Sequence, residues 1–138
     1  MCGLSRESAR KRVLIVDDHY IVRRGLTELL GQQPDLAVCA VAASGEEALE
    51  LTDRQCVDLA IVDISLGQMD GLQLTEELKR RHPNLIVLIL SMHDELHYGK
   101  RALGAGASGF VAKQNGGETL LEAIRQVLGG QSYYRQSN

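Results

Sequence analysis

Large aromatic side chains are scarce in this chain. Among 138 residues there is no Trp, and Phe and Tyr together account for 4% of the sequence. The apolar fraction of 44% is nevertheless ordinary for a globular protein. A chain of this length is one domain that buries a real core. We therefore predict a core built mainly from aliphatic side chains.

Long apolar runs are also absent. No run reaches the roughly 18 residues of a membrane span, and the longest unbroken one, Leu85 to Leu90, has the length of a strand. The start of the chain is polar and basic with no long apolar stretch behind it, so it does not resemble a secretory signal. We expect no membrane among the partners of this domain.

Cysteine and net charge are both low. The three cysteines, Cys2, Cys39 and Cys56, are an odd number without the spacing of metal ligands. Cys39 and Cys56 lie in apolar stretches, which favours buried thiols over a disulfide and hence a reducing, cytoplasmic compartment. The net charge of −3 argues against direct binding of nucleic acid by this segment.

Five short apolar runs alternate with five segments of helical spacing. The runs lack polar alternation, as expected for parallel strands covered on both faces, and they are Val13–Val16, Ala37–Ala42, Leu59–Val62, Leu85–Leu90 and Phe110–Ala112. This alternation predicts an α/β fold, a flavodoxin-like (βα)5 doubly wound parallel sheet with strand order 2-1-3-4-5. The domain would span residues 12–130, after an N-terminal tail over 1–11 and before the start of a linker over 131–138.

The helical segments carry signals for their starts and stops. In the first, the apolar stripe ends at Gly31, and Ser44 with Glu47 three residues later forms a capping-box pattern for the second. The fourth, at about residues 94–105, contains Gly99 and Gly104 and few large apolar side chains. We expect this fourth helix to be the element most easily displaced.

Polar side chains follow four of the five runs. They are Asp17 and Asp18 after the first run, Asp63 after the third, Ser91 after the fourth and Lys113 after the fifth. The functional site of such a sheet lies beyond the carboxyl ends of its strands, so these side chains should meet at one edge. Each residue alone could be a helix cap, a turn residue or a solvated charge. Their joint occurrence at carboxyl ends favours a site.

The residue types indicate a chemistry for this edge. Three neighbouring carboxylates repel one another unless a cation lies among them, and hard oxygen ligands suit Mg²⁺. The compact charge of Lys113 suits a phosphoryl oxygen, and the hydroxyl of Ser91 can donate a hydrogen bond to another. A carboxylate nucleophile, a metal ion and a cationic side chain are the groups that phosphoryl transfer requires.

The same segments resemble those of CheY-like response-regulator receiver domains. The resemblance extends over about Arg12 to Gly130 and rests on five stretches, Val13–His19 (VLIVDDH), Ile61–Leu66 (IVDISL), Met69–Gly71 (MDG), Leu90–Asp94 (LSMHD) and Gly106–Lys113 (GASGFVAK). The Leu90–Asp94 stretch is similar to the NarL/FixJ-like subfamily, whose output is a LuxR-type helix-turn-helix DNA-binding domain.

This resemblance implies a phosphoacceptor signalling domain of a bacterial two-component system, and no enzyme in the ordinary sense. Asp63 would accept a phosphoryl group from a sensor histidine kinase, and Lys113 would hold the acyl phosphate. Asp18, Asp63 and the backbone carbonyl of Ser65 would bind Mg²⁺, with Asp17 helping through water.

The resemblance also implies a switch. Ser91 would turn inward to bond the phosphoryl group, and Phe110 would follow into the vacated space, so that the surface of the fourth helix, fifth strand and fifth helix changes its partners. Ser65 and His93 lie two residues beyond Asp63 and Ser91 and would tune the lifetime of the phosphorylated state. For His93, a solvated position at a helix start is the alternative.

The family pattern further implies a homodimer on activation, and DNA binding only through a C-terminal helix-turn-helix domain that is absent from these 138 residues. We expect that domain in a longer natural protein, the alternative being a stand-alone receiver. Two other functions stay open. A phosphorylation-independent receiver-like interaction module would tend to lose the acidic pair or the lysine, and an aspartyl phosphatase would need a second acid at the position of Ser65.

Overall fold

The computed structural model describes residues 10–67, 69–91 and 95–134, and for residues 95–98 only the backbone. One parallel sheet contains the strands β1 (Lys11–Val16), β2 (Leu36–Ala42), β3 (Leu59–Asp63), β4 (Ile86–Ser91), β5 (Gly109–Ala112) and β6 (Tyr133–Tyr134). Their order is β2-β1-β3-β4-β5-β6. The predicted order of the first five strands is confirmed.

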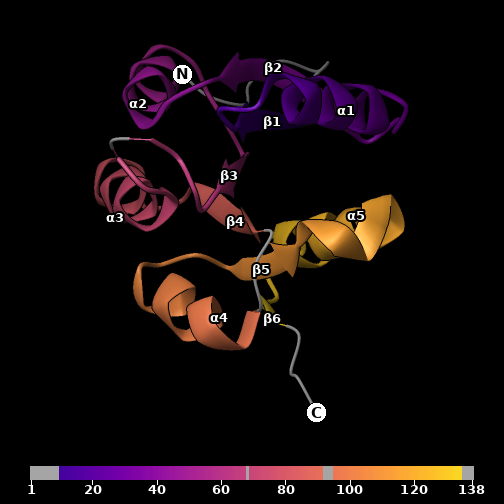
Figure 1. Cartoon of the computed structure of the whole chain (residues 1–138). Coiled ribbons are helices and arrows are strands. Elements are labelled where there is room, and N and C mark those ends of the chain that lie inside the picture. The colour runs from indigo at the N-terminus through magenta and orange to yellow at the C-terminus, as the bar shows by residue number, and fades with distance from the viewer. Residues whose placement is uncertain (1–9, 68, 92–94, 135–138) are drawn as a thin grey trace.

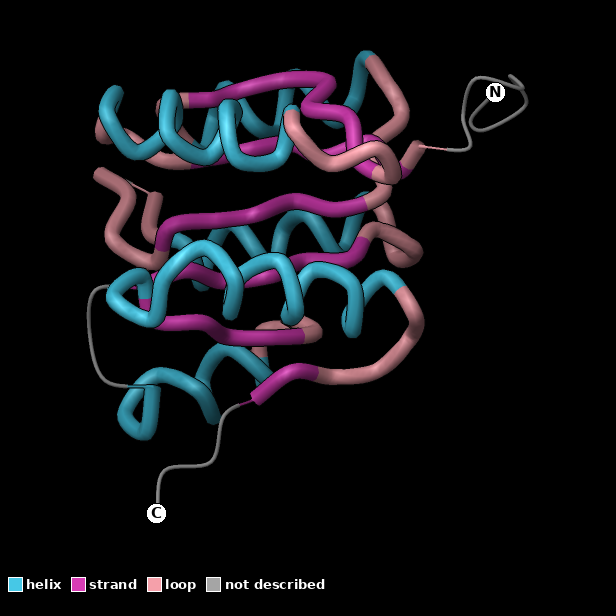
Figure 2. Tube along the Cα trace, turned by 90° about the vertical axis from the view of Figure 1, so that its right-hand side faces the viewer, coloured by secondary structure: helices cyan, strands magenta, loops and turns pink. Residues whose placement is uncertain are grey.

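Five α-helices cover the two faces of the sheet. They are α1 (Tyr20–Gly31), α2 (Gly45–Arg54), α3 (Gly71–Arg81), α4 (Glu95–Gly104) and α5 (Gly116–Leu128), the last preceded by a short 3-10 helix over Lys113–Asn115. Helices α2, α3 and α4 lie on one face and α1 and α5 on the other (Figure 1). Figure 2 shows the strands side by side with helices before and behind them. The predicted doubly wound α/β fold is confirmed, and none of the described helices is long and apolar enough to cross a membrane.

The core consists of two apolar clusters, one on each face of the sheet. Because successive strand residues point to opposite faces, Leu14 and Val16 belong to the cluster that includes side chains of α2, α3 and α4, whereas Val13 and Ile15 belong to the one that includes side chains of α1 and α5. Aliphatic side chains dominate both clusters, as the composition predicted. The exception is Phe110 in β5, which is fully buried on the α4 side.

The predicted helix signals are confirmed at α1 and α2. Leu30 of α1 is fully buried, and Leu26 and Leu29 pack beside it. At α2, the Ser44 side chain accepts a hydrogen bond from the N–H of Glu47 at 3.1 Å. The Glu47 carboxylate accepts from the residue before the cap, at 2.8 Å, rather than from the cap itself.

The sequence analysis missed β6. This two-residue strand lies in the segment expected to begin a linker, and Tyr133 pairs with Gly109 of β5. The hydroxyl of Tyr134 donates a hydrogen bond to the carbonyl of Ala107 at 2.6 Å. Two half-buried tyrosines between polar residues carry no strand periodicity, so only the exposed edge of β5 defines this pairing.

The expectation of two buried thiols is wrong. Cys39 and Cys56 are each only half-buried, because β2 is an edge strand and Cys56 lies in the loop before β3. Cys39 is free, whereas Cys56 is disulfide-bonded.

The start of α3 packs closely against the loop that follows β3. Asp70 caps the helix, since its carboxylate accepts from the N–H of Gln73 at 2.8 Å and the Gln73 side chain accepts from the N–H of Asp70 at 3.1 Å. The N–H of Gly71 donates to the carbonyl of Ile64 at 3.0 Å. A Cβ atom at Gly71 would collide with the carbonyl oxygen of Asp63 and lie 2.7 Å from Cα of Ile64. Only glycine allows this approach.

We predict that Gly71→Ala lowers the free energy of unfolding by about 1–3 kcal/mol, because the new methyl group overpacks a backbone contact. Urea denaturation followed by circular dichroism measures this loss. Gly25→Ala is the control, because Gly25 lies inside α1 with no atom within 4 Å of its added Cβ. This control should gain about 0.5–1 kcal/mol of stability, and equal effects of the two substitutions would contradict the packing argument.

Candidate functional site

The predicted polar residues lie at the carboxyl ends of four adjacent strands. Asp17 follows β1, Asp63 ends β3, Ser91 ends β4 and Lys113 follows β5. The strand order places these four strands next to one another in the sheet. Residues up to 96 positions apart in the sequence therefore come within bonding distance.

Asp63 has one oxygen that is held in place and one that has no partner among the described residues. Its side chain is 2% exposed, and its Oδ1 accepts a hydrogen bond from the N–H of Ser65 at 3.1 Å and lies 3.5 Å from Nζ of Lys113. Its Oδ2 is buried without a hydrogen-bond partner among the described residues. Burial raises the pKa of Asp63 above its usual value, and the charges of Asp17 and Asp18 add to the rise. An additional cation would therefore stabilise this carboxylate.

Lys113 joins the two buried carboxylates. Its Nζ donates to Oδ2 of Asp17 at 2.9 Å, and its side chain is 13% exposed against 1% for Asp17. Asp17 also accepts from the N–H of His19 at 2.8 Å, and its backbone carbonyl accepts from Arg23 at 2.8 Å. Asp18 is 39% exposed and borders solvent. The lysine charge thus lies beside Asp17 and Asp63, and no contact of Lys113 with Asp18 is found among the described residues.

The three carboxylates and one imidazole form a compact set of potential metal ligands. Ligand atoms of Asp17, Asp18, His19 and Asp63 lie within 4.8 Å of one another. The buried, unpartnered Oδ2 of Asp63 belongs to this set. Hard carboxylate oxygens at the edge of solvent fit Mg²⁺, which keeps part of its water shell. The residues therefore fit the predicted ion.

His19 is the site residue that the sequence analysis missed. Its ring is 62% exposed. Its Nδ1 nevertheless lies 3.0 Å from Oδ1 of Asp17, 3.0 Å from Oδ1 of Asp18 and 3.9 Å from Oδ2 of Asp63. Its position directly after the acidic pair was the available signal.

The residues predicted for the switch and for the phosphate lifetime are Ser91, Phe110, Ser65 and His93. Ser91 is fully buried at the end of β4, where it pairs in register with Ala112 of β5. Phe110 is fully buried two residues earlier in β5. Ser65 is exposed and contributes its backbone N–H to Asp63. His93 lies outside the described residues.

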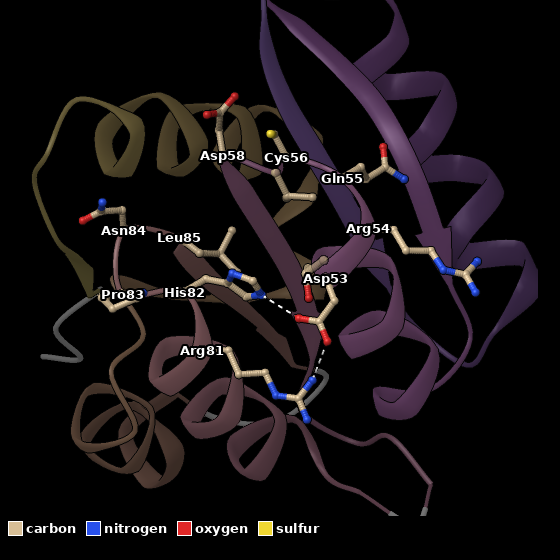
Figure 3. A pocket seen from close by; sticks show the side chains of 12 residues that line it. Asp53, Arg54, Gln55, Cys56, Asp58, Arg81, His82, Pro83, Asn84 and Leu85 are labelled. Atoms are coloured by element: carbon tan, nitrogen blue, oxygen red, sulfur yellow. Dashed lines mark hydrogen bonds and ion pairs between the residues drawn. The ribbon is translucent and has the colours of Figure 1, made fainter. Parts of the chain in front are cut away.

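A separate cavity lies at the opposite edge of the sheet, where the strands begin. It has a volume of about 550 Å³ and is lined by residues 52–58 and 81–85. Figure 3 shows Asp53 facing Arg81 and His82, at 2.8 and 3.1 Å. Asp53 is paired with Arg81, and Asp58 accepts a hydrogen bond from the N–H of Arg12, so the cavity has no unpaired carboxylate comparable to Asp63 among its described lining residues.

Comparison with known proteins places these residues in a family. The model of the response regulator receiver domain matches residues 13–125. The transcriptional activator protein ExaE of Pseudomonas putida is 41% identical over 124 residues, which cover 90% of this chain and 58% of that protein. The transcriptional regulatory protein DegU of Brevibacillus brevis is 34% identical over 122 residues, covering 88% and 52%. The chain thus spans little more than half the length of these relatives.

A solved structure agrees in fold. The two-component response regulator of the LuxR family from Aurantimonas sp. SI85-9A1 superposes with a TM-score of 0.86 at 33% identity, over 90% of this chain and 89% of that one. The family match includes Asp17, Asp63, Ser91 and Lys113. The chain therefore belongs to the response regulator receiver domain family.

Proposed function

We propose that Asp63 accepts a phosphoryl group from a phosphohistidine of a sensor histidine kinase. The observation that carries this proposal is the buried Oδ2 of Asp63, which has no hydrogen-bond partner in the described structure. The other oxygen of the same carboxylate is oriented by Ser65 and faces Lys113. One oxygen is thus held while the other is available for attack.

In the proposed step, Oδ2 of Asp63 attacks phosphorus, a P–O bond forms and the P–N bond to the kinase histidine breaks. The histidine nitrogen leaves with the bonding electron pair, and the acyl phosphate remains on Asp63. The charge of Lys113 stabilises the negative phosphoryl oxygens near which it is held. Its bond to Asp17 keeps it in place.

Asp18, Asp63 and the backbone carbonyl of Ser65 would hold Mg²⁺, with Asp17 acting through water. When bound, this ion supplies positive charge that offsets the repulsion between the carboxylates and the phosphoryl group. The fit rests on three carboxylates around one point, of which Asp63 has a buried oxygen without a hydrogen-bond partner among the described residues.

Phosphorylation would then change the surface formed by α4, β5 and α5. Ser91 would bond a phosphoryl oxygen, and Phe110 would shift within the core between β5 and α4. Both side chains are fully buried in adjacent strands, so a move by one requires the other to repack. Helix α4 contributes mainly the small Ala102 to the core among its described side chains, which supports its role as the displaced element.

The proposed partners follow from the relatives. Both curated relatives are transcriptional regulators, so we propose that this receiver controls a DNA-binding helix-turn-helix domain and forms a homodimer on activation. The domain itself would not contact DNA, and its kinase would meet it in the cytoplasm. The alternative, a phosphorylation-independent interaction module, would need neither a carboxylate oxygen available for attack nor a lysine beside it. It therefore leaves Oδ2 of Asp63 and the nearby Lys113 unexplained.

We predict that acetyl phosphate with Mg²⁺ adds one phosphoryl mass to the chain, as measured by intact-protein mass spectrometry. Asp63→Asn should abolish this gain because an amide cannot serve as the nucleophile, and EDTA should also prevent it. Asp53→Asn is the matched control, since Asp53 is paired with Arg81 at the opposite edge. A gain that survives Asp63→Asn would place the phosphoryl group on another residue and overturn the role of Asp63, whereas no gain at all would favour the phosphorylation-independent module.

The switch generates a second prediction. Ser91→Ala should keep the phosphoryl gain but reduce the phosphorylation-induced amide shifts over α4, β5 and α5, because the hydroxyl that would follow the phosphoryl group is lost. Two-dimensional NMR with and without acetyl phosphate measures these shifts. Ser108→Ala, which precedes β5 at its other end, is the control. Undiminished shifts in Ser91→Ala would rule out the proposed coupling.

A third prediction concerns the lifetime of the phosphorylated state. His93→Ala and Ser65→Ala should each change the rate at which the phosphoryl group is lost, because both positions lie two residues beyond a site residue. The decay of the phosphorylated mass after removal of acetyl phosphate gives the rate. Rates equal to that of the unmodified chain would assign His93 and Ser65 no role in dephosphorylation.

A further inference from the structure

The imidazole of His19 lies where a cation among the three acids would be placed. Its Nδ1 is 3.0 Å from a carboxylate oxygen of Asp17 and 3.0 Å from one of Asp18. Oδ2 of Asp63 is 3.9 Å away and has no hydrogen-bond partner among the described residues. Nδ1 of His19 is therefore one of the potential metal ligands.

The spacing of these atoms suits a shared ion of first-row transition-metal size. For metal–ligand bonds of about 2.0–2.2 Å, neighbouring ligand atoms around one ion lie roughly 3 Å apart at right angles. The two distances of 3.0 Å, from Nδ1 to Asp17 and to Asp18, match neighbouring ligand positions around one ion. The distance of 3.9 Å to Asp63 matches two ligand positions separated by a wider angle. No large movement of the backbone is needed to bring these ligand atoms around one metal ion.

The local backbone fixes the ring near this point. The N–H of His19 donates to Oδ1 of Asp17 at 2.8 Å, the same oxygen that Nδ1 approaches. Arg23 in the first turn of α1 holds the carbonyl of Asp17 at 2.8 Å. These contacts limit where the imidazole can point, although 62% of its surface is exposed.

We propose that His19 supplies a nitrogen ligand to the cation site, so that the site prefers a divalent transition-metal ion such as Co²⁺, Ni²⁺ or Zn²⁺ to Mg²⁺. Imidazole suits these ions, whereas Mg²⁺ is bound through oxygen. The inference rests on the cation site of the proposed function and adds a ligand and a metal preference to it. The phosphoacceptor role of Asp63 does not depend on it.

The test measures the binding of Co²⁺ and of Mg²⁺ separately, by isothermal titration calorimetry on the whole chain and on His19→Ala. The affinity for Co²⁺ should fall at least about tenfold in the variant, while that for Mg²⁺ should change less than about threefold. His82→Ala is the matched control, because His82 also lies against a carboxylate, Asp53, at the opposite edge of the sheet. It should leave both affinities unchanged.

A spectroscopic signal identifies the ligand directly. With Nδ1 bound to Co²⁺, the exchangeable proton on Nε2 of His19 should give a proton NMR signal shifted far outside the diamagnetic range. This signal should be present in the unmodified chain and in His82→Ala, and absent in His19→Ala. Its presence in His19→Ala would overturn the proposal.

Three further results would overturn the inference. Equal losses of Co²⁺ and Mg²⁺ affinity in His19→Ala would mean that the histidine only positions the acids. No loss would mean that it does not bind the ion, and a gain would mean that the ring competes with the ion for the carboxylates. Failure of acetyl phosphate to modify Asp63, with Co²⁺ binding that depends on His19, would reject the proposed function while leaving the inference in place.

Discussion

The repulsion among Asp17, Asp18 and Asp63 is the constraint on which the rest of this domain depends. Two of the three carboxylates are almost wholly buried, where charges are screened little and an unpaired one is costly. Lys113 provides one opposing charge, bonded to Asp17 and 3.5 Å from Asp63. The arrangement leaves excess negative charge beside Oδ2 of Asp63, which has no hydrogen-bond partner among the described residues. A cation is the addition that this geometry favours.

The fold keeps the acids together in spite of that repulsion. Each acid follows or ends a strand whose apolar side chains are buried in the two clusters, so burial of the strands holds the carboxylates at the edge. The close approach of Gly71, at the start of α3, to the backbone of Asp63 holds the loop after β3 in position. The stability of the core therefore offsets the free energy that repulsion among the three carboxylates costs, as is common for functional sites.

Much of this arrangement could be predicted from the sequence. Apolar runs of strand length, such as Leu59–Val62, identify buried parallel strands, and their carboxyl ends locate Asp63 and Lys113. His19 could not be found in this way, because a residue beside a conspicuous acidic pair has no periodicity of its own and its ring direction depends on the start of α1. The strand at Tyr133 was missed because its pairing depends on a partner edge far away in the sequence. Half-burial of Cys56 was missed for a similar reason, since local apolar neighbours do not report the depth of a loop.

The strand β6 has a mechanical consequence for the chain that follows α5. Tyr133 is paired with Gly109, the Tyr134 hydroxyl is bonded to Ala107, and the Tyr134 ring lies 3.9 Å from the position of a Cβ on Gly99 in α4. The last described residues are thus held by β5, by the loop before it and by α4. A displacement of α4 against β5 would therefore also change the contacts of Tyr133 and Tyr134. The last described residues of the chain would register any change in how these two elements pack.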